Sequence, residues 1–155
     1  MGVPLFAVSI TYFSSPMHFA SVRLITADFE RLASFYEQLF GQPLTRYTPT
    51  FGELRTSGAT LAIGHTSTLA PFGGEQVASP AANRSAIIEF RMADVDADYQ
   101  RLAELLGPTL VQAPTTMPWG NRSLLFRDPD GNLVNFFTPV TPAAQQRLFK
   151  QATAE

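Results

Sequence analysis

The sequence predicts an α+β fold of two β-α-β-β-β modules, whose curled mixed sheets form half-barrels around a central pocket. Two observations support this prediction. First, a strand-and-helix pattern occurs twice along the chain, with landmark residues at one constant offset, which indicates an internal repeat. The matching landmarks are Asp28 with Asp94, Leu39 with Leu105, and Gly41 with Gly107. Second, the chain contains a clear hairpin near its end.

That hairpin is predicted by the stretch from Arg127 to Phe137. Apolar residues 123–126 and 133–137 flank a turn that contains Pro129, Gly131 and Asn132. These are the residue types that tight turns need for a fixed or positive φ. Asn135 is an amide within an otherwise apolar strand, so we expect it to face a pocket or a polar partner.

Composition excludes several classes of function. The chain has 155 residues, of which 45% are hydrophobic and 15% charged, which suits one domain or two half-size modules with a shared core. A net charge of −2 without a basic stripe argues against nucleic acid as a partner. The absence of cysteine excludes disulfides, thiolate ligands and a cysteine nucleophile. No apolar run approaches the ~20 residues of a membrane span, and we take the cytoplasm as the default location.

Residues 1–16 are predicted to be an N-terminal extension. They fit a flexible lead-in, or a translation start placed ahead of Met17 as the working start. A signal peptide is disfavoured because no Lys or Arg precedes the apolar run. A further alternative is an extra strand that pairs with a sheet edge.

The first module is predicted over residues 17–65. It starts with a strand at 19–26, and Asp28 then caps a helix that ends at Gly41. The apolar stripe of this helix consists of Phe29, Leu32, Phe35, Tyr36, Leu39 and Phe40. Three short strands are expected after the helix, at 44–47, 51–56 and 60–65.

A linker or flexible loop is predicted over residues 66–84, which are rich in Gly, Pro, Ser, Ala and Thr. The second module follows over residues 85–140, with a strand at 85–92 and a helix from Asp94 to Gly107. A strand near 109–112 and the closing hairpin complete it. Residues 141–155 form a C-terminal tail with a short helix over about 142–151.

The Asp-Pro-Asp-Gly-Asn turn at 128–132, placed after a repeated strand-helix start, resembles the vicinal oxygen chelate superfamily. That superfamily includes glyoxalase I, bleomycin-resistance proteins and extradiol dioxygenases. The matching segments are 21–41, 85–107 and 118–139. The resemblance implies that the concave face of each module holds the ligand. It also implies a homodimer, because this fold often closes its barrels by pairing modules within or between chains.

In the metal enzymes of that family, the first and last strands of each module supply one ligand each, usually His or Glu. The corresponding positions here are Ser21, Ala62, Ile87 and Asn135. Isoleucine and alanine have no donor atom, and a hydroxyl or an amide oxygen is a poor ligand by itself. The only histidines, His18 and His65, are predicted at the surface or at a strand end. We therefore predict no metal and no other cofactor.

Strand alternation predicts which side chains face the cavity. These are Ser21, Arg23 and Ile25, then Ile87, Glu89 and Arg91, then Leu133, Asn135 and Phe137, while Val22, Leu24, Ile88 and Phe90 pack under the helices. Arg23 and Glu89 are repeat-equivalent and are expected to form an ion pair, because a buried charge needs a partner. The pair either closes the barrel or serves as a polar handle for a ligand. As a further alternative, Glu89 acts as a general base.

Three further side chains have open assignments. Trp119, the only tryptophan, either stacks on a ligand at the pocket mouth or braces the closing hairpin from the core. Arg122 is expected to donate to a loop carbonyl or to pair with Asp128 or Asp130. Glu53, between Phe51 and Leu54, is a further candidate for the inward face, but its register is not secure.

The sequence thus predicts a metal-free protein that resembles the bleomycin-resistance branch and binds a small, partly aromatic molecule. The predicted ligand-binding residues are Ser21, Arg23, Glu89, Trp119, Asn135 and Phe137. One alternative is a metal-dependent lyase, isomerase or dioxygenase of the same superfamily with non-standard ligands. Another is a small dimeric partner protein with a vestigial pocket.

Overall fold

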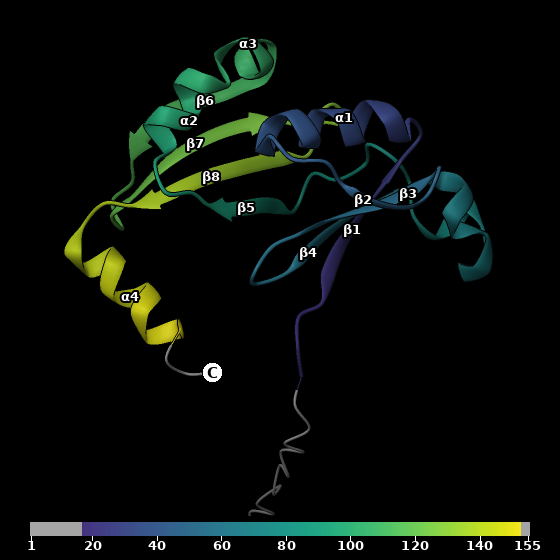
Figure 1. The fold of residues 1–155 in the computed structure, drawn as a ribbon, viewed down its shortest axis with the longest axis horizontal. Helices are drawn as coiled ribbons and strands as arrows, with labels where there is room; N and C mark the ends of the chain where they lie inside the picture. The colour runs from purple at the N-terminus through teal and green to yellow at the C-terminus, as the bar shows by residue number, and fades with distance from the viewer. Residues whose placement is uncertain (1–16, 153–155) are drawn as a thin grey trace, which may run out of the picture.

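The structure, a computed structural model, describes residues 17–152 (Figure 1). The predictions for residues 1–16 therefore fall outside the described residues. The first module consists of β1 (Ser21–Thr26), α1 (Phe29–Phe40), β2 (Thr45–Thr48), β3 (Phe51–Arg55) and β4 (Thr60–His65). Its strand order is β1-β4-β3-β2, with β1 parallel to β4 and the other pairs antiparallel.

The second module has the same strand arrangement. It consists of β5 (Ile87–Arg91), α2 (Val95–Arg101), α3 (Ala103–Leu106), β6 (Leu110–Thr116), β7 (Asn121–Arg127) and β8 (Leu133–Pro139). The order is β5-β8-β7-β6, with β5 parallel to β8. Strands β7 and β8 form the hairpin that the turn residues predict.

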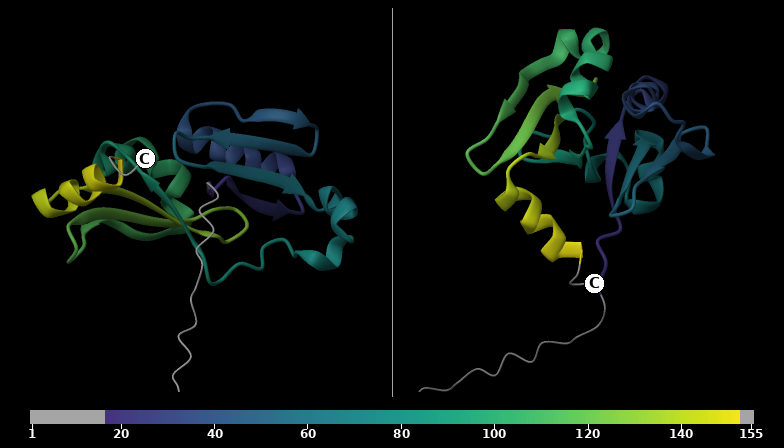
Figure 2. Two further views of the ribbon diagram at one scale, coloured as in Figure 1. Left: turned by 90° about the horizontal axis from the view of Figure 1, so that it is seen from below. Right: turned by 60° about the vertical axis from the view of Figure 1, so that its left-hand side comes forward.

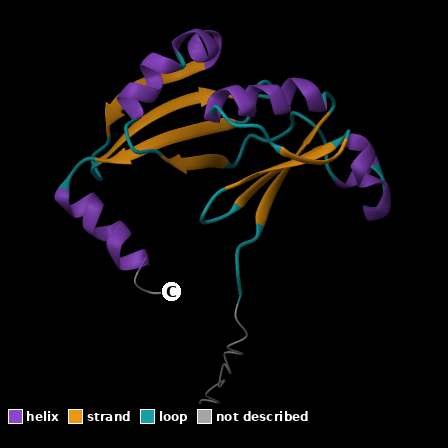
Figure 3. Cartoon of the chain, viewed as in Figure 1, coloured by secondary structure: helices purple, strands orange, loops and turns teal. Residues whose placement is uncertain are grey.

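The predicted α+β class with two modules is confirmed, although neither module closes into a barrel. The two four-stranded mixed sheets are open and lie next to each other, and α1, α2 and α3 cover the same side of them (Figure 3). The last helix, α4 (Pro142–Ala152), lies on the other side, below the second sheet (Figure 1).

Helix α1 forms as the sequence predicts. The Asp28 side chain accepts a hydrogen bond from the Arg31 amide at the N-terminus, and Gly41 takes a left-handed conformation with φ 64° at the C-terminus. The apolar stripe is buried except for the partly buried Phe40, and Leu32, Tyr36 and Leu39 are fully inaccessible to solvent. This helix therefore supplies the first module's share of the core.

The predicted single helix up to Gly107 is wrong, because the chain breaks at Leu102 into α2 and α3. The backbone of Leu102 has φ −101° and ψ 8°, and Gly107 continues into a 3₁₀ turn rather than a left-handed cap. The spacing of apolar residues in the sequence gives no sign of this break, because Val95, Leu102 and Leu106 are all buried on one side of both segments.

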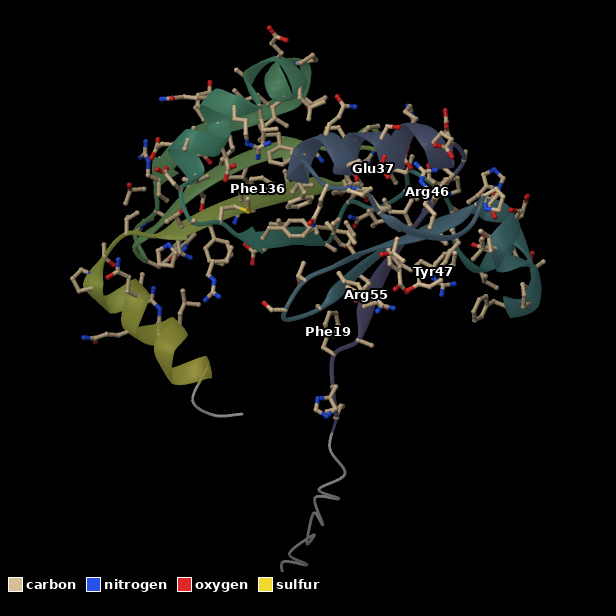
Figure 4. All side chains as sticks on the ribbon, in the orientation of Figure 1. Phe19, Glu37, Arg46, Tyr47, Arg55 and Phe136 are labelled. Atoms are coloured by element: carbon tan, nitrogen blue, oxygen red, sulfur yellow. The ribbon has the colours of Figure 1, made fainter. Side chains whose placement is uncertain are left out.

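Helix α1 joins the two modules by packing on the second sheet. Its Phe35 ring lies 6.4 Å from Phe126, and its Phe40 ring lies 4.8 Å from Phe90 and 5.5 Å from Phe136. Figure 4 shows Phe136 beneath the helices, on the covered side of the second sheet. Both modules thus bury their apolar side chains in one continuous core.

One segment and one side chain differ from their predictions. The expected linker or flexible loop between the two modules contains two 3₁₀ helices, Thr66–Phe72 and Glu75–Val77 (Figure 2). Val22 was predicted under the helices but is 43% exposed, because it lies near the start of β1 at the edge of its sheet. No helix within residues 17–152 is long and apolar enough to cross a membrane.

Candidate functional site

A cleft of about 290 Å³ lies where the two modules meet α4. The turn between β3 and β4 forms one wall, β5 and β8 form the second, and α4 the third. Its lining consists of Thr56, Ser57, Gly58, Glu89, Phe90, Arg91, Phe137 and Leu148. Glu89 and Phe137 were predicted as ligand-binding residues, and the structure brings them together here. The volume of this cleft lies just below the usual range for ligand pockets, ~300–1,000 Å³, which suits a small ligand.

Glu89 and Asn135 form the polar floor beside this cleft. They lie opposite each other in the parallel register of β5 and β8, and Asn135 Nδ2 donates to Glu89 Oε1 at 2.8 Å. The other amide atom, Asn135 Oδ1, is buried and has no hydrogen-bond partner among the described residues. A buried acceptor without a partner is costly unless a ligand or water satisfies it. The sequence predicts that Asn135 faces a pocket or a polar partner, and the Glu89 carboxylate is that partner.

Arg91 and Phe137 form the next layer of the same cleft. They are also register partners on β5 and β8, two residues further along each strand. The Arg91 side chain is exposed, and it forms neither a hydrogen bond nor an ion pair with another residue of the described chain. Its guanidinium is therefore available to a negatively charged group in the cleft.

The predicted ion pair between Arg23 and Glu89 is wrong. The Arg23 guanidinium lies 4.9 Å from the centre of the Phe51 ring and 5.5 Å from that of Phe72. Phe72 ends the first 3₁₀ helix, Thr66–Phe72. This segment lies between the two repeated modules, so the internal repeat does not predict its position. Since the sheets lie side by side instead of facing each other, β1 does not present Arg23 to Glu89 (Figure 3).

The exposed face of the first sheet carries a second polar and aromatic group. Glu53 is the register partner of Ala62, and it accepts hydrogen bonds from Tyr47 at 3.3 Å and from Arg55 at 3.2 Å. Figure 4 shows Tyr47 and Arg55 on the side of this sheet away from α1. Ser21, at the start of β1, is exposed and lines no part of the cleft described above.

Trp119 is 58% exposed in the turn between β6 and β7, which rules out the core-bracing role. Its backbone carbonyl accepts a hydrogen bond from Arg147 of α4, and Trp119 is not among the residues that line the cleft. Stacking of Trp119 on a ligand stays a prediction.

The predicted partners of Arg122 are wrong. Arg122 forms a two-point ion pair with Asp96 of α2, at 2.6 and 2.8 Å. Alternation along β7 puts Arg122 on the same side as the buried Leu124 and Phe126, where the helices lie. This ion pair raises the pKa of Arg122 and lowers that of Asp96, mainly through their hydrogen bond. Asp128 and Asp130 lie at the other end of β7.

The four positions that the family uses for metal ligands do not fit a metal here. Ala62 and Ile87 offer no donor atom, and Asn135 is engaged with Glu89 through one of its two polar atoms. His65 Nδ1 accepts from the Ser67 amide and caps the following 3₁₀ helix. Within residues 17–152, no three His, Asp or Glu side chains gather closely enough to hold a metal ion.

Sequence reasoning missed two walls of the cleft. The turn at Thr56–Gly58 carries no feature beyond ordinary turn residues, so nothing marked it as a site element. Leu148 belongs to a helix that was correctly predicted, and its approach to β5 depends on where the chain turns after β8. Arg91 was placed on the cavity face by alternation but was not selected as a site residue.

A family model described as the Glyoxalase/Bleomycin resistance protein/Dioxygenase superfamily matches residues 18–136. A comparison with curated proteins found no match. Among solved structures, a glyoxalase/bleomycin resistance protein/dioxygenase from Nocardioides is 23% identical with a TM-score of 0.68, covering 86% of this chain and 90% of that one.

Two further solved structures have the same fold. A family enzyme from Burkholderia phytofirmans PsJN is 18% identical with a TM-score of 0.67, covering 80% of this chain and 100% of its own. A protein of unknown function from Agrobacterium tumefaciens is 27% identical with a TM-score of 0.65, covering 82% and 97%. With the family model spanning most of the chain, we conclude that this protein belongs to the glyoxalase/bleomycin resistance/dioxygenase superfamily.

Proposed function

We propose that this protein binds a small, partly aromatic molecule without a metal, in the cleft between β5, β8, the β3–β4 turn and α4. The observation that carries the proposal is a cleft of about 290 Å³ whose lining combines the Glu89 and Arg91 side chains with the Phe137 ring. Leu148 of α4 supplies a further apolar wall. A ligand with one donor group and one or two rings suits these features.

The metal-free part of the proposal is supported by the chemistry of the donors. Two of the four family positions, Ala62 and Ile87, cannot coordinate a cation. The carboxylate nearest to the family position Asn135 belongs to Glu89, which is hydrogen-bonded to that amide. Such a set favours sequestration of an organic molecule over metal-assisted chemistry. A cytoplasmic location remains part of the proposal as the default.

The test combines a metal measurement with a ligand screen. We expect mass spectrometry to find less than stoichiometric Mn, Fe, Ni and Zn in protein expressed with all four supplied. We expect a panel of planar aromatic compounds to yield ligands that raise Tm. Phe137→Ala should weaken the best ligand at least tenfold, whereas Trp119→Ala tests the separate stacking prediction. One metal per chain, or no ligand from the panel, would overturn the proposal.

We further propose that the protein forms a homodimer, with the exposed face of the first sheet against a second copy. This face combines cationic and aromatic side chains, among them Arg23, Phe51 and the half-exposed Tyr47. The same face also carries the ion pair of Arg55 with Glu53, so two copies can meet through groups of opposite charge. Aromatic residues and arginine are the types enriched at such interfaces.

Light scattering at micromolar concentration should therefore give twice the chain mass of 17.0 kDa. Arg23→Glu should shift the protein toward the monomer, because it removes the cation that packs on the Phe51 and Phe72 rings of the proposed interface. Arg84→Glu, a charge reversal at another exposed arginine, serves as the matched control. A wild type that stays at 17.0 kDa would contradict the dimer.

A further inference from the structure

The cleft presents one positive and one negative group on the same face of a single strand. Glu89 and Arg91 are two residues apart on β5, which sets their backbones about 6.5 Å apart and points both side chains the same way. They do not pair with each other, because the one polar side-chain partner of Glu89 in the described chain is Asn135. Both residues line the cleft, with Phe137 across from Arg91.

We propose that the ligand is a small aromatic zwitterion, such as an aromatic α-amino acid, which deepens and rests on the binding function proposed above. Its carboxylate pairs with Arg91 through the two-pronged geometry that a guanidinium offers. Its ammonium group donates to the Glu89 carboxylate, whose Oε1 also accepts from Asn135 Nδ2. Its ring packs against Phe137 and Leu148.

Electrostatics disfavour the three other charge classes. A neutral aromatic ligand would cover Arg91 and Glu89 without replacing the water that they lose. A purely anionic ligand would lie against Glu89, and a purely cationic ligand against Arg91, so each would gain one attraction and one repulsion. Only a ligand that carries both charges satisfies both groups in a cleft of about 290 Å³.

Four probes that share one ring system separate these classes: L-tryptophan is the zwitterion, tryptamine the cation, indole-3-propionate the anion, and indole the neutral compound. We expect calorimetric titration at pH 7 and low salt to show L-tryptophan binding at least tenfold more tightly than each of the other three. Arg91→Gln should remove the preference of L-tryptophan over tryptamine. Glu89→Gln should remove its preference over indole-3-propionate.

Arg84→Gln and Glu104→Gln change the same residue types at exposed positions that do not line the cleft, and both should preserve the wild-type order. Equal affinities for indole and L-tryptophan, or no binding of L-tryptophan at millimolar concentration, would overturn the zwitterion inference. The binding function itself fails only when the wider aromatic panel also yields no ligand. An unchanged Tm in both cleft variants shows that any loss of affinity is not a loss of folding.

Discussion

We expect Asp128→Asn to lower the free energy of unfolding by about 2–4 kcal/mol. Asp128 is buried, and four donors point at its carboxylate: the Tyr36 hydroxyl at 2.9 Å, Asn132 Nδ2 at 2.7 Å, and the backbone amides of Asp130 and Asn132 at 3.0 and 2.9 Å. An asparagine keeps one acceptor oxygen and turns an NH₂ group toward the remaining donors. The substitution therefore leaves buried donors unpaired.

The loss extends beyond the turn because Asp128 connects the two modules. Tyr36 belongs to α1 of the first module, and the neighbouring Asp130 accepts from Arg31 of the same helix at 2.5 Å. Urea unfolding followed by circular dichroism measures the change. Asp28→Asn is the matched control, because asparagine caps a helix as well as aspartate does, and we expect it to be close to neutral. Equal losses in the two variants would contradict this account.

The pH dependence of the unfolding free energies of the wild type and Asp128→Asn gives a second measurement. Burial raises the pKa of Asp128 above its ordinary value of 3.8, against the opposing effect of its hydrogen bonds. The folded state then holds this proton more tightly than the unfolded chain, so the wild type gains stability as pH falls through the raised pKa toward 3.8. Asp128→Asn lacks this titration. The difference in unfolding free energy should therefore widen from neutral pH to about pH 4.

The turn sequence predicted the hairpin but could not predict the role of Asp128. Proline, glycine and asparagine at fixed places report local backbone geometry, which the sequence determines within a few residues. The contact of Asp128 with Tyr36 joins positions that are 92 residues apart. That contact depends on how α1 lies across the second sheet, and no periodicity along the chain carries this information.

The face of each strand was predictable, whereas the relation between the two sheets was not. Alternation correctly separated Glu89 and Asn135 from the buried Val134 and Phe136. The inferred pairing of Arg23 with Glu89 assumed that equivalent strands of the two modules face each other across a pocket. The helix-covered sides of the two sheets instead contribute to one core. The Arg23 guanidinium packs against the Phe51 and Phe72 rings.

The neighbouring residues Phe136 and Phe137 provide the sharpest test of this arrangement. Phe136 is fully buried, and its ring lies 5.2 Å from Phe126, 5.8 Å from Phe90 and 5.5 Å from Phe40 of the first module. Phe137 points to the opposite face and lines the cleft. Phe136→Ala removes a ring from the core that both modules share. We expect it to lower the free energy of unfolding by about 3–5 kcal/mol.

Phe137→Ala should cost only about 1 kcal/mol, because its ring is half-buried and leaves no enclosed cavity. Its effect should fall on ligand affinity instead, since the ring forms a wall of the cleft. Phe136→Leu, which keeps most of the buried volume, should lie between the two alanine variants in stability. Urea unfolding and calorimetric titration of all three variants separate the two faces. Similar stability losses for Phe136→Ala and Phe137→Ala would mean that β8 does not separate the core from the cleft. That result would contradict the proposed ligand site.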